Sequence, residues 1–193
     1  MSARDTDQLT IRTATSVDIP ILVRHRREMW NDIGAVTRAS LASQPRADAD
    51  DQREMASRIF TASQLDGADH VYRDWVKSEM ASGHFIGFLA VDVDGKVAGG
   101  GAIWLQPIPP RPHAGTATRI PYILSMYTEH GYRRRQVGTR LVQAMISWAR
   151  EHGHTWRITL HASDEGRPLY SGVGFLPSRE MYFELSGNSA TRR

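Results

Sequence analysis

The sequence contains no cysteine among its 193 residues. This absence excludes disulfides, metal sites with thiolate ligands and catalysis by a cysteine nucleophile. Long apolar runs are also missing: no stretch approaches the ~18 apolar residues of a membrane-spanning helix, and the polar start, 1–7, lacks the apolar core of a signal peptide. We therefore expect a cytoplasmic protein that needs no metal and does not associate with a membrane.

Neither sign of charge dominates, because 24 basic residues face 21 acidic ones and the net charge is only +3. A hydrophobic content of 40% with 23% charged residues is typical of one globular domain. We expect this domain over residues 8–185, with flexible tails at 1–7 and 186–193. The arginines are clustered locally, which favours a site for an anion over a surface for nucleic acid.

The most informative stretch combines an apolar strand at 120–128, a basic turn at 133–136 and an amphipathic helix that ends at Gly153. The apolar residues of the helix recur at steps of three and four: Val137, Leu141, Met145 and Trp148, widened by Val142, Ile146 and Ala149. The first amides of a helix lack partners, and the helix dipole favours negative charge there. With three consecutive arginines, the turn predicts a phosphate site; the alternative is a surface turn with solvated arginines.

This turn resembles the acetyl-CoA-binding motif of the GNAT superfamily of N-acetyltransferases, Arg/Gln-x-x-Gly-x-Gly/Ala, which falls here on residues 133–138. Gln136 occupies the place of the first glycine, and Gly138 that of the second. Residues 158–175 resemble a later motif of the same superfamily, a strand followed by a short helix that ends in Tyr-x-x-x-Gly-Phe. The two motifs occur in the order and spacing of the superfamily.

The resemblance implies an α/β (α+β) fold, a single domain in which a mixed, mostly antiparallel sheet is flanked by helices. It also implies acetyl-CoA as cosubstrate and direct transfer of the acetyl group to a primary amine of a small molecule or protein in a ternary complex. The expected cofactor contacts are Met126, Tyr127, Thr128, Arg133, Arg134, Arg135, Gln136, Val137, Gly138, Thr139 and Ser163. Ser163 is equally consistent with a helix cap.

Tyr170 matches the superfamily's general-acid tyrosine, which protonates the departing CoA thiolate. The alternative is a tyrosine that only packs under the cofactor. No residue stands out as the base, because Glu28, Glu79 and Glu129 are each more typical of solvated surface charges; ordered water can also deprotonate the amine. The tentative acceptor contacts are Glu28, Trp30 and Tyr122.

The rest of the pattern predicts helices between the first two strands. A capping box at 15–18 begins a helix that should end near Gly34. A helical segment from Pro45 to Leu65 should break at Asp66–Gly67, and a second helix should run from 69 to 82. In the superfamily, this region shapes the acceptor site.

A hairpin is predicted at 85–105, with Asp94–Gly95 as its two-residue turn. Three glycines at 99–101 suggest a bulge or a close backbone approach. Residues 107–119 are expected to form a long loop over the acceptor site, and alternating apolar residues predict further strands at 9–13, 156–162 and 181–185.

Two other classes of protein fit the basic turn. A non-catalytic CoA-binding regulatory module would keep the turn without needing Tyr170. A nucleic-acid-binding domain would use Arg133, Arg134 and Arg135 on phosphates, although the aromatic residues that usually accompany such a surface are missing. We expect acetyl-CoA and an amine acceptor as partners, and the resemblance allows a homodimer.

Overall fold

The computed structural model describes residues 8–43, 57–110, 112, 118–154 and 156–178. The elements in chain order are β1 (Thr10–Thr13), η1 (Ser16–Asp18), α1 (Ile19–Ser43), α3 (Ala62–Ala81), β2 (Phe85–Val91), β3 (Val97–Pro107), β4 (Arg119–Thr128), η3 (His130–Tyr132), α4 (Val137–Glu151), β5 (Thr159–Leu160) and α5 (Arg167–Val173). The two predicted tails and the predicted strand at 181–185 lie outside the described residues.

The five strands form one sheet in the order β1-β2-β3-β4-β5. The first four pair in antiparallel fashion, and β5 joins β4 in parallel. A parallel pair needs a crossover connection, which α4 supplies between β4 and β5. The predicted fold, a mixed and mostly antiparallel sheet flanked by helices, is therefore confirmed.

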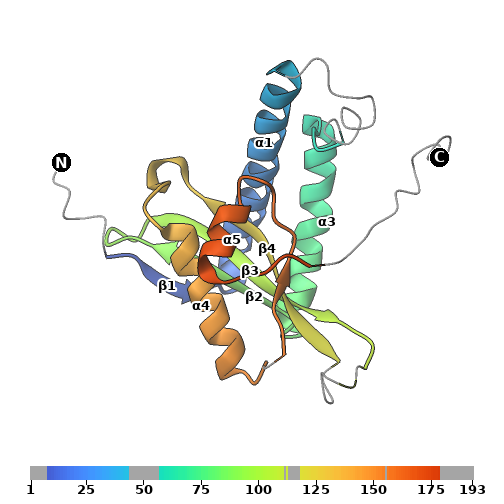
Figure 1. Ribbon diagram of the computed structural model, residues 1–193, viewed down its shortest axis with the longest axis vertical. Helices are drawn as coiled ribbons and strands as arrows, with labels where there is room; N and C mark the ends of the chain where they lie inside the picture. Colours follow the sequence, from blue (N-terminus) through green and yellow to red (C-terminus); the bar gives the residue numbers. More distant parts are fainter. Residues whose placement is uncertain (1–7, 44–56, 111, 113–117, 155, 179–193) are drawn as a thin grey trace.

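Helices cover both faces of the sheet (Figure 1). On one face, α1 and α3 pack against each other and against the strands, and the buried residues there are Ile19, Leu22, Val23, Tyr72, Val76, Phe85, Leu89 and Ala102. On the other face lie α4 and α5, and the buried cluster there comprises Leu9, Phe88, Ala90, Ala98, Ile103, Ile123, Val137, Leu141, Val142 and Met145.

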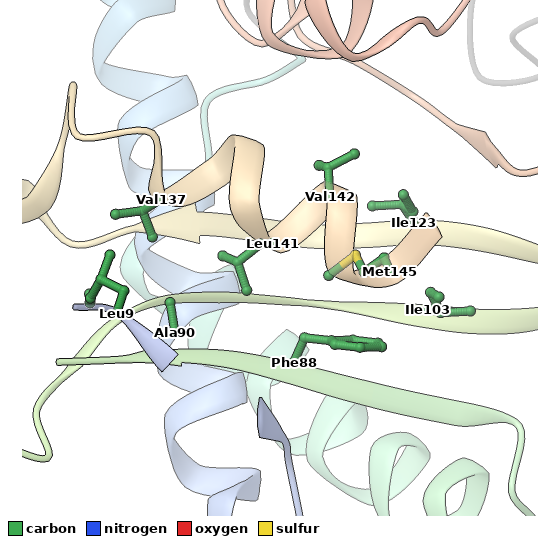
Figure 2. Packing of buried hydrophobic residues seen from close by; sticks show 10 residues of the cluster. Leu9, Phe88, Ala90, Ile103, Ile123, Val137, Leu141, Val142 and Met145 are labelled. Atoms are coloured by element: carbon green, nitrogen blue, oxygen red, sulfur yellow. The ribbon is translucent and has the colours of Figure 1, made fainter. Parts of the chain in front are cut away.

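The apolar stripe of α4 lies directly on the sheet, as its sequence predicts. Figure 2 shows Leu141 and Met145 pointing from α4 towards Phe88 and Ile103 on the strands below. Leu141 and Met145 are fully buried, and burying a side chain of this size contributes about 1.5–3 kcal/mol. This packing fixes the start of α4 relative to the end of β4.

The helix boundaries differ from the sequence-based expectation at two glycines. α1 continues through Gly34 to Ser43, and α3 continues through Asp66–Gly67. A single glycine costs a helix only about 1 kcal/mol relative to alanine, and the buried residues Thr37 and Tyr72 in the turns that follow offset that cost. The predicted ends at these positions were therefore wrong.

The hairpin and the fifth strand also differ in detail. The β2–β3 loop has three residues, 93–95, which lie between Asp92 and Lys96. The Asp92 amide donates to the Lys96 carbonyl across the loop, and Gly95 has a positive φ of 79°. This is the longer type of hairpin loop, in which a glycine completes the turn. β5 is confined to Thr159–Leu160, whereas the alternating pattern predicted a strand over 156–162.

Within the described part of the chain, no helix is long and apolar enough to cross a membrane. The same residues contain no group of three or more His, Asp or Glu side chains that could hold a metal ion. The cytoplasmic location stays a prediction.

Candidate active site

β4 carries a bulge beside the middle of β3. Gly101 of β3 lies opposite two residues of β4, Ser125 and Met126, and the register of the two strands shifts there. Ser125 adopts a positive φ of 54°. A bulge leaves one residue outside the ladder of backbone hydrogen bonds. The main chain of β4 is therefore irregular at 125–126, as the three glycines of β3 predicted for this region.

The glycines of β3 let β4 approach closely at this bulge. A Cβ atom on Gly99 would lie 2.7 Å from the Tyr127 carbonyl oxygen, and one on Gly101 would overlap the sulfur of Met126. Real Cβ atoms do not approach backbone atoms so closely, which makes glycine the residue that fits at 99, whereas at 101 the flexible side chain of Met126 would have to shift. The run of three glycines thus serves strand packing and not phosphate binding.

β4 and β5 separate immediately beyond their short pairing. β5 pairs only with Tyr122 and Ile123 of β4. From Leu124 to Thr128, the same edge of β4 has no strand partner among the residues that the structure describes. Unpaired N–H and C=O groups along a strand edge form hydrogen bonds readily with an extended ligand. The edge begins at the bulge and leads towards the basic turn.

Tyr72 holds the bulge from the side of α1 and α3. Its hydroxyl lies 3.0 Å from the Ser125 Oγ, and burial raises the pKa of this tyrosine. The guanidinium of Arg26 lies 4.3 Å from the centre of the Tyr72 ring. Tyr72 lies within the helix predicted at 69–82, but the sequence does not show which residue its hydroxyl reaches.

The basic turn ends in a left-handed residue at the start of α4. Gln136 is the N-cap residue, with φ 59° and ψ 15°, and its side chain makes no capping hydrogen bond. Arg134 also has a positive φ, of 64°. The first intrahelical bond runs from the Arg140 amide to the Gln136 carbonyl, so the amides of 137–139 precede the helical ladder. These three amides and the helix dipole are the groups that the predicted anion site requires, and binding of an anion there stays a prediction.

The three arginines of the turn point to different partners. Arg133 forms an ion pair with Asp32 of α1 and donates from Nε to the Thr128 carbonyl. Arg135 lies over the ring of Tyr132 at 5.8 Å from its centroid. Arg134 is exposed. The structure therefore turns Arg133 towards α1, whereas the sequence alone grouped it with the other two as a phosphate contact.

Gly138 permits close contact between α4 and α5. A Cβ atom at this position would lie 2.6 Å from the Cδ1 of Leu169. The second glycine of the motif thus lies at the contact between α4 and α5, and the approach of a ligand to it stays a prediction. Leu169 precedes Tyr170, so this contact fixes α5 next to the turn.

A model of the acetyltransferase (GNAT) family matches residues 49–175, well over half of the chain. The chain belongs to this family. It is therefore an acetyltransferase, as the sequence predicted, and acetyl-CoA is the acetyl donor of the family. Comparison with curated proteins gave no match.

Solved structures support the fold of this GNAT acetyltransferase. A GCN5-related N-acetyltransferase from Ralstonia eutropha JMP134 is similar with a TM-score of 0.72 at 23% identity, over 93% of this chain and 100% of that chain. A predicted acetyltransferase from Clostridium acetobutylicum, solved with acetyl-CoA, has a TM-score of 0.65 at 23% identity, over 93% of this chain and 96% of that one. At these identities, the likeness concerns the fold.

In this acetyltransferase, Tyr170 lies on α5, beside the core on the α4 side of the sheet. Its ring packs edge-on against Phe175 at 5.9 Å. Burial, assisted by nearby Tyr122, raises the pKa of Tyr170 to about 12. The phenol is therefore protonated throughout the neutral range, as a proton donor requires.

The three candidate carboxylates have different surroundings. Glu129 accepts hydrogen bonds from Arg24 at 2.5 Å and from His25 at 3.1 Å. Burial alone would raise the pKa of Glu129, but these two partners outweigh it and lower the pKa. A carboxylate with a lowered pKa is a weak base, so Glu129 is a poor candidate for that role.

Three other tentative residues, Glu28, Trp30 and Glu79, lie on α1 and α3. Glu79 accepts a hydrogen bond from the Trp104 indole at 2.8 Å, and Glu28 lies 3.5 Å from the Asn31 amide. Trp30 packs against Phe60 at 5.4 Å. Glu28 and Trp30 lie on α1 close to Arg26 in the chain, and Glu79 lies near the end of α3.

Tyr122 lies opposite Trp104 of β3, and Ser163 lies just before α5. The Tyr122 hydroxyl is 2.5 Å from the His161 Nδ1, which gives His161 a hydrogen-bonding partner. Ser163 Oγ accepts a hydrogen bond from the Gly166 amide at 3.2 Å, just before α5. This bond is the cap-like role that was the alternative for Ser163, and its contact with the cofactor stays a prediction.

Proposed function

We propose that this acetyltransferase transfers the acetyl group of acetyl-CoA to a primary amine of a small molecule by direct attack in a ternary complex. One observation carries the proposal: an edge of β4 without a strand partner among the described residues runs from the bulge at Ser125 to the amide-rich start of α4. An extended thioester with a pyrophosphate at one end matches this arrangement. A primary amine of a protein would react in the same way.

The residues present fit acetyl-CoA in two ways. The edge at 124–128 offers main-chain donors and acceptors to the amides of the pantetheine arm. The amides of 137–139, with exposed Arg134 and Arg135, offer donors and positive charge to the pyrophosphate. We assign the cofactor contacts to these groups and give Arg133 the task of joining the turn to α1.

In the reaction, the amine nitrogen attacks the thioester carbon and a C–N bond forms. The C–S bond breaks, the CoA thiolate departs with the electron pair, and the nitrogen loses a proton. Main-chain amides near the bulge are placed to stabilise the negative charge on the carbonyl oxygen. Water takes the proton from the amine in this scheme and passes it to solvent, because the Glu129 carboxylate is already bonded to Arg24 and His25. Solvent afterwards returns a proton to Tyr170.

Tyr170 supplies the proton to the thiolate. Burial disfavours the charged forms of both the phenol and the departing sulfur, so the proton stays on Tyr170 until the thiolate forms beside it. Because the pKa of Tyr170 is raised to about 12, its ionisation does not lower the rate between pH 7 and 10.

Removal of the phenol tests this role. Tyr170→Phe should lower kcat by about 100-fold, a usual effect of a lost general acid, and should leave the affinity for acetyl-CoA within about threefold. Calorimetric titration with acetyl-CoA measures affinity, and release of the CoA thiol with a panel of primary amines measures turnover. The absence of cysteine keeps the thiol assay free of background from the protein.

Tyr132→Phe is the matched control, because the Tyr132 hydroxyl donates to Asp92 at the hairpin loop. It should change neither quantity by more than about threefold. Full turnover in Tyr170→Phe would remove Tyr170 as the acid. Tight binding of acetyl-CoA without turnover on any amine would favour the regulatory CoA-binding module.

The arrangement of the arginines argues against the nucleic-acid hypothesis. Arg133 is engaged by Asp32, so the three arginines do not form one free basic cluster. Binding to DNA or RNA that weakens steeply with salt would revive it.

A further inference from the structure

We propose that the acceptor amine of this enzyme carries a carboxylate group and that Arg26 on α1 binds it. The inference rests on the proposed amine acetylation and specifies its substrate class. It depends on the position of Arg26, on the charge of its neighbours and on the rings that flank it.

Arg26 contacts Tyr72, and Tyr72 in turn contacts the bulge at which we place the thioester. Its guanidinium stacks on the Tyr72 ring at 4.3 Å, and the Tyr72 hydroxyl lies 3.0 Å from the Ser125 Oγ. A molecule held by Arg26 therefore lies on the α1–α3 side of β4. Tyr170, which we expect at the leaving thiolate, lies on the α4–α5 side. Donor and acceptor thus approach the bulge from the two sides of the sheet.

The neighbouring arginines have carboxylate partners. Arg24 pairs with Glu129 at 2.5 Å, and Arg27 pairs with Asp66 at 2.6 Å and Asp69 at 2.9 Å. Arg26 has no such partner in the described ranges 8–43, 57–110, 112, 118–154 and 156–178; it makes only aromatic contacts there. A partly buried cation without a counter-charge is unfavourable. A substrate with one negative charge would neutralise it.

Aromatic rings lie against the guanidinium of Arg26, so its edge is the part that can bind a ligand. Tyr72 covers one face at 4.3 Å, and Trp30 lies 5.8 Å from the guanidinium carbon. Phe60 packs on Trp30 and extends the apolar surface. The edge of a guanidinium carries paired N–H donors that match the two oxygens of a carboxylate. A single charge favours a carboxylate over a phosphate dianion.

Matched pairs of amines test the inference. Amino acids and their carboxamides present the same amine with and without the carboxylate. The amine of the carboxamide is the less basic, so more of it is unprotonated and ready to attack at neutral pH. Intrinsic reactivity therefore does not favour the expected result. We expect kcat/KM to be at least tenfold higher for the carboxylate form. Arg26→Gln should lower kcat/KM for that form by roughly 10- to 100-fold, mainly through KM, and leave the carboxamide within about threefold.

Two further variants sharpen the test. Arg26→Lys keeps the charge but not the paired donors and should show an intermediate loss. Arg38→Gln removes an exposed arginine from the same helix and should have no effect. Calorimetry with acetyl-CoA checks that each variant is folded.

The outcomes separate the two proposals. Equal turnover of carboxylates and carboxamides, or a loss in Arg26→Gln that is the same for both, overturns the carboxylate site and leaves the acetyltransferase proposal in place. Binding of acetyl-CoA with no turnover of any amine overturns both.

Discussion

Gln136 shows how a residue other than glycine occupies the first glycine position of the predicted acetyl-CoA-binding motif. It takes the left-handed conformation that glycine adopts without strain, with φ 59°. For an L-residue this conformation costs roughly 1–2 kcal/mol. The turn keeps its shape because Val137, the next residue, is buried in the core and anchors the start of α4.

Gln136→Gly should therefore stabilise the protein by about 0.5 kcal/mol, since the relief of strain exceeds the extra entropy of an unfolded glycine. Gln143 is an exposed residue in the middle of the same helix. Gln143→Gly should destabilise by about 1 kcal/mol. Urea unfolding of both variants measures the difference. Equal destabilisation by the two changes would mean that position 136 is not strained.

At the scale of the element, β3 and α3 use glycine in opposite ways. Gly99 lies where β4 crosses closely, and its missing side chain makes room for the Tyr127 carbonyl. Gly67 lies in α3, and a Cβ atom there would meet nothing within 4 Å. The first glycine is required by packing, and the second only weakens a helix.

Alanine at these two positions should move stability in opposite directions. Gly99→Ala places a Cβ atom 2.7 Å from backbone, which cannot move as a flexible side chain can, and should destabilise by about 1–3 kcal/mol. Gly67→Ala should stabilise by about 0.5–1 kcal/mol through helix propensity. Urea unfolding checks both. A neutral Gly99→Ala would show that β3 and β4 are further apart than described.

At the scale of the whole molecule, hydrogen bonds and ion pairs of buried or half-buried side chains dock α1 onto the sheet. Near the start of α1, Arg12 of β1 pairs with Asp18 at 2.8 Å, and this bond lowers the pKa of Asp18 to about 2. Further along, His25 is buried between α1 and β4 and bonds Glu129 at 3.1 Å. Burial, with the nearby charge of Arg24, lowers the pKa of His25 despite the opposing effect of Glu129.

Both groups make the fold sensitive to acid. The folded pKa of His25 lies below its ordinary value of 6.5, so the unfolded chain gains a proton first and stability falls as pH drops below about 6.5. For Asp18, stability present above its ordinary pKa of 3.8 is lost as pH falls towards 2. The urea midpoint of the wild type should therefore decrease from pH 7.5 to pH 5.

His25→Gln should flatten this pH dependence, although His154, whose pKa burial also lowers, keeps part of it. His70→Gln removes an exposed histidine of α3 and should leave the slope unchanged. An unchanged slope in His25→Gln would show that this histidine is not held neutral by burial.

The sequence by itself determined the family, the basic turn before α4, the apolar face of α4, the β2–β3 hairpin and the position of Tyr170 on a short helix. These features depend on residues close together in the chain, whose spacing and type decide turns and helix faces. The glycines at 99–101 even indicated the bulge, because close backbone approach demands that residue.

Only the tertiary structure decided which distant side chains meet. Helices α1 and α3 pass through Gly34 and Gly67 because packing outweighs local propensity. The bonds from Tyr72 to Ser125 and from Arg133 to Asp32 join residues far apart in the chain, and no local pattern encodes them. The place of Arg26 beside the bulge follows from the same long-range packing.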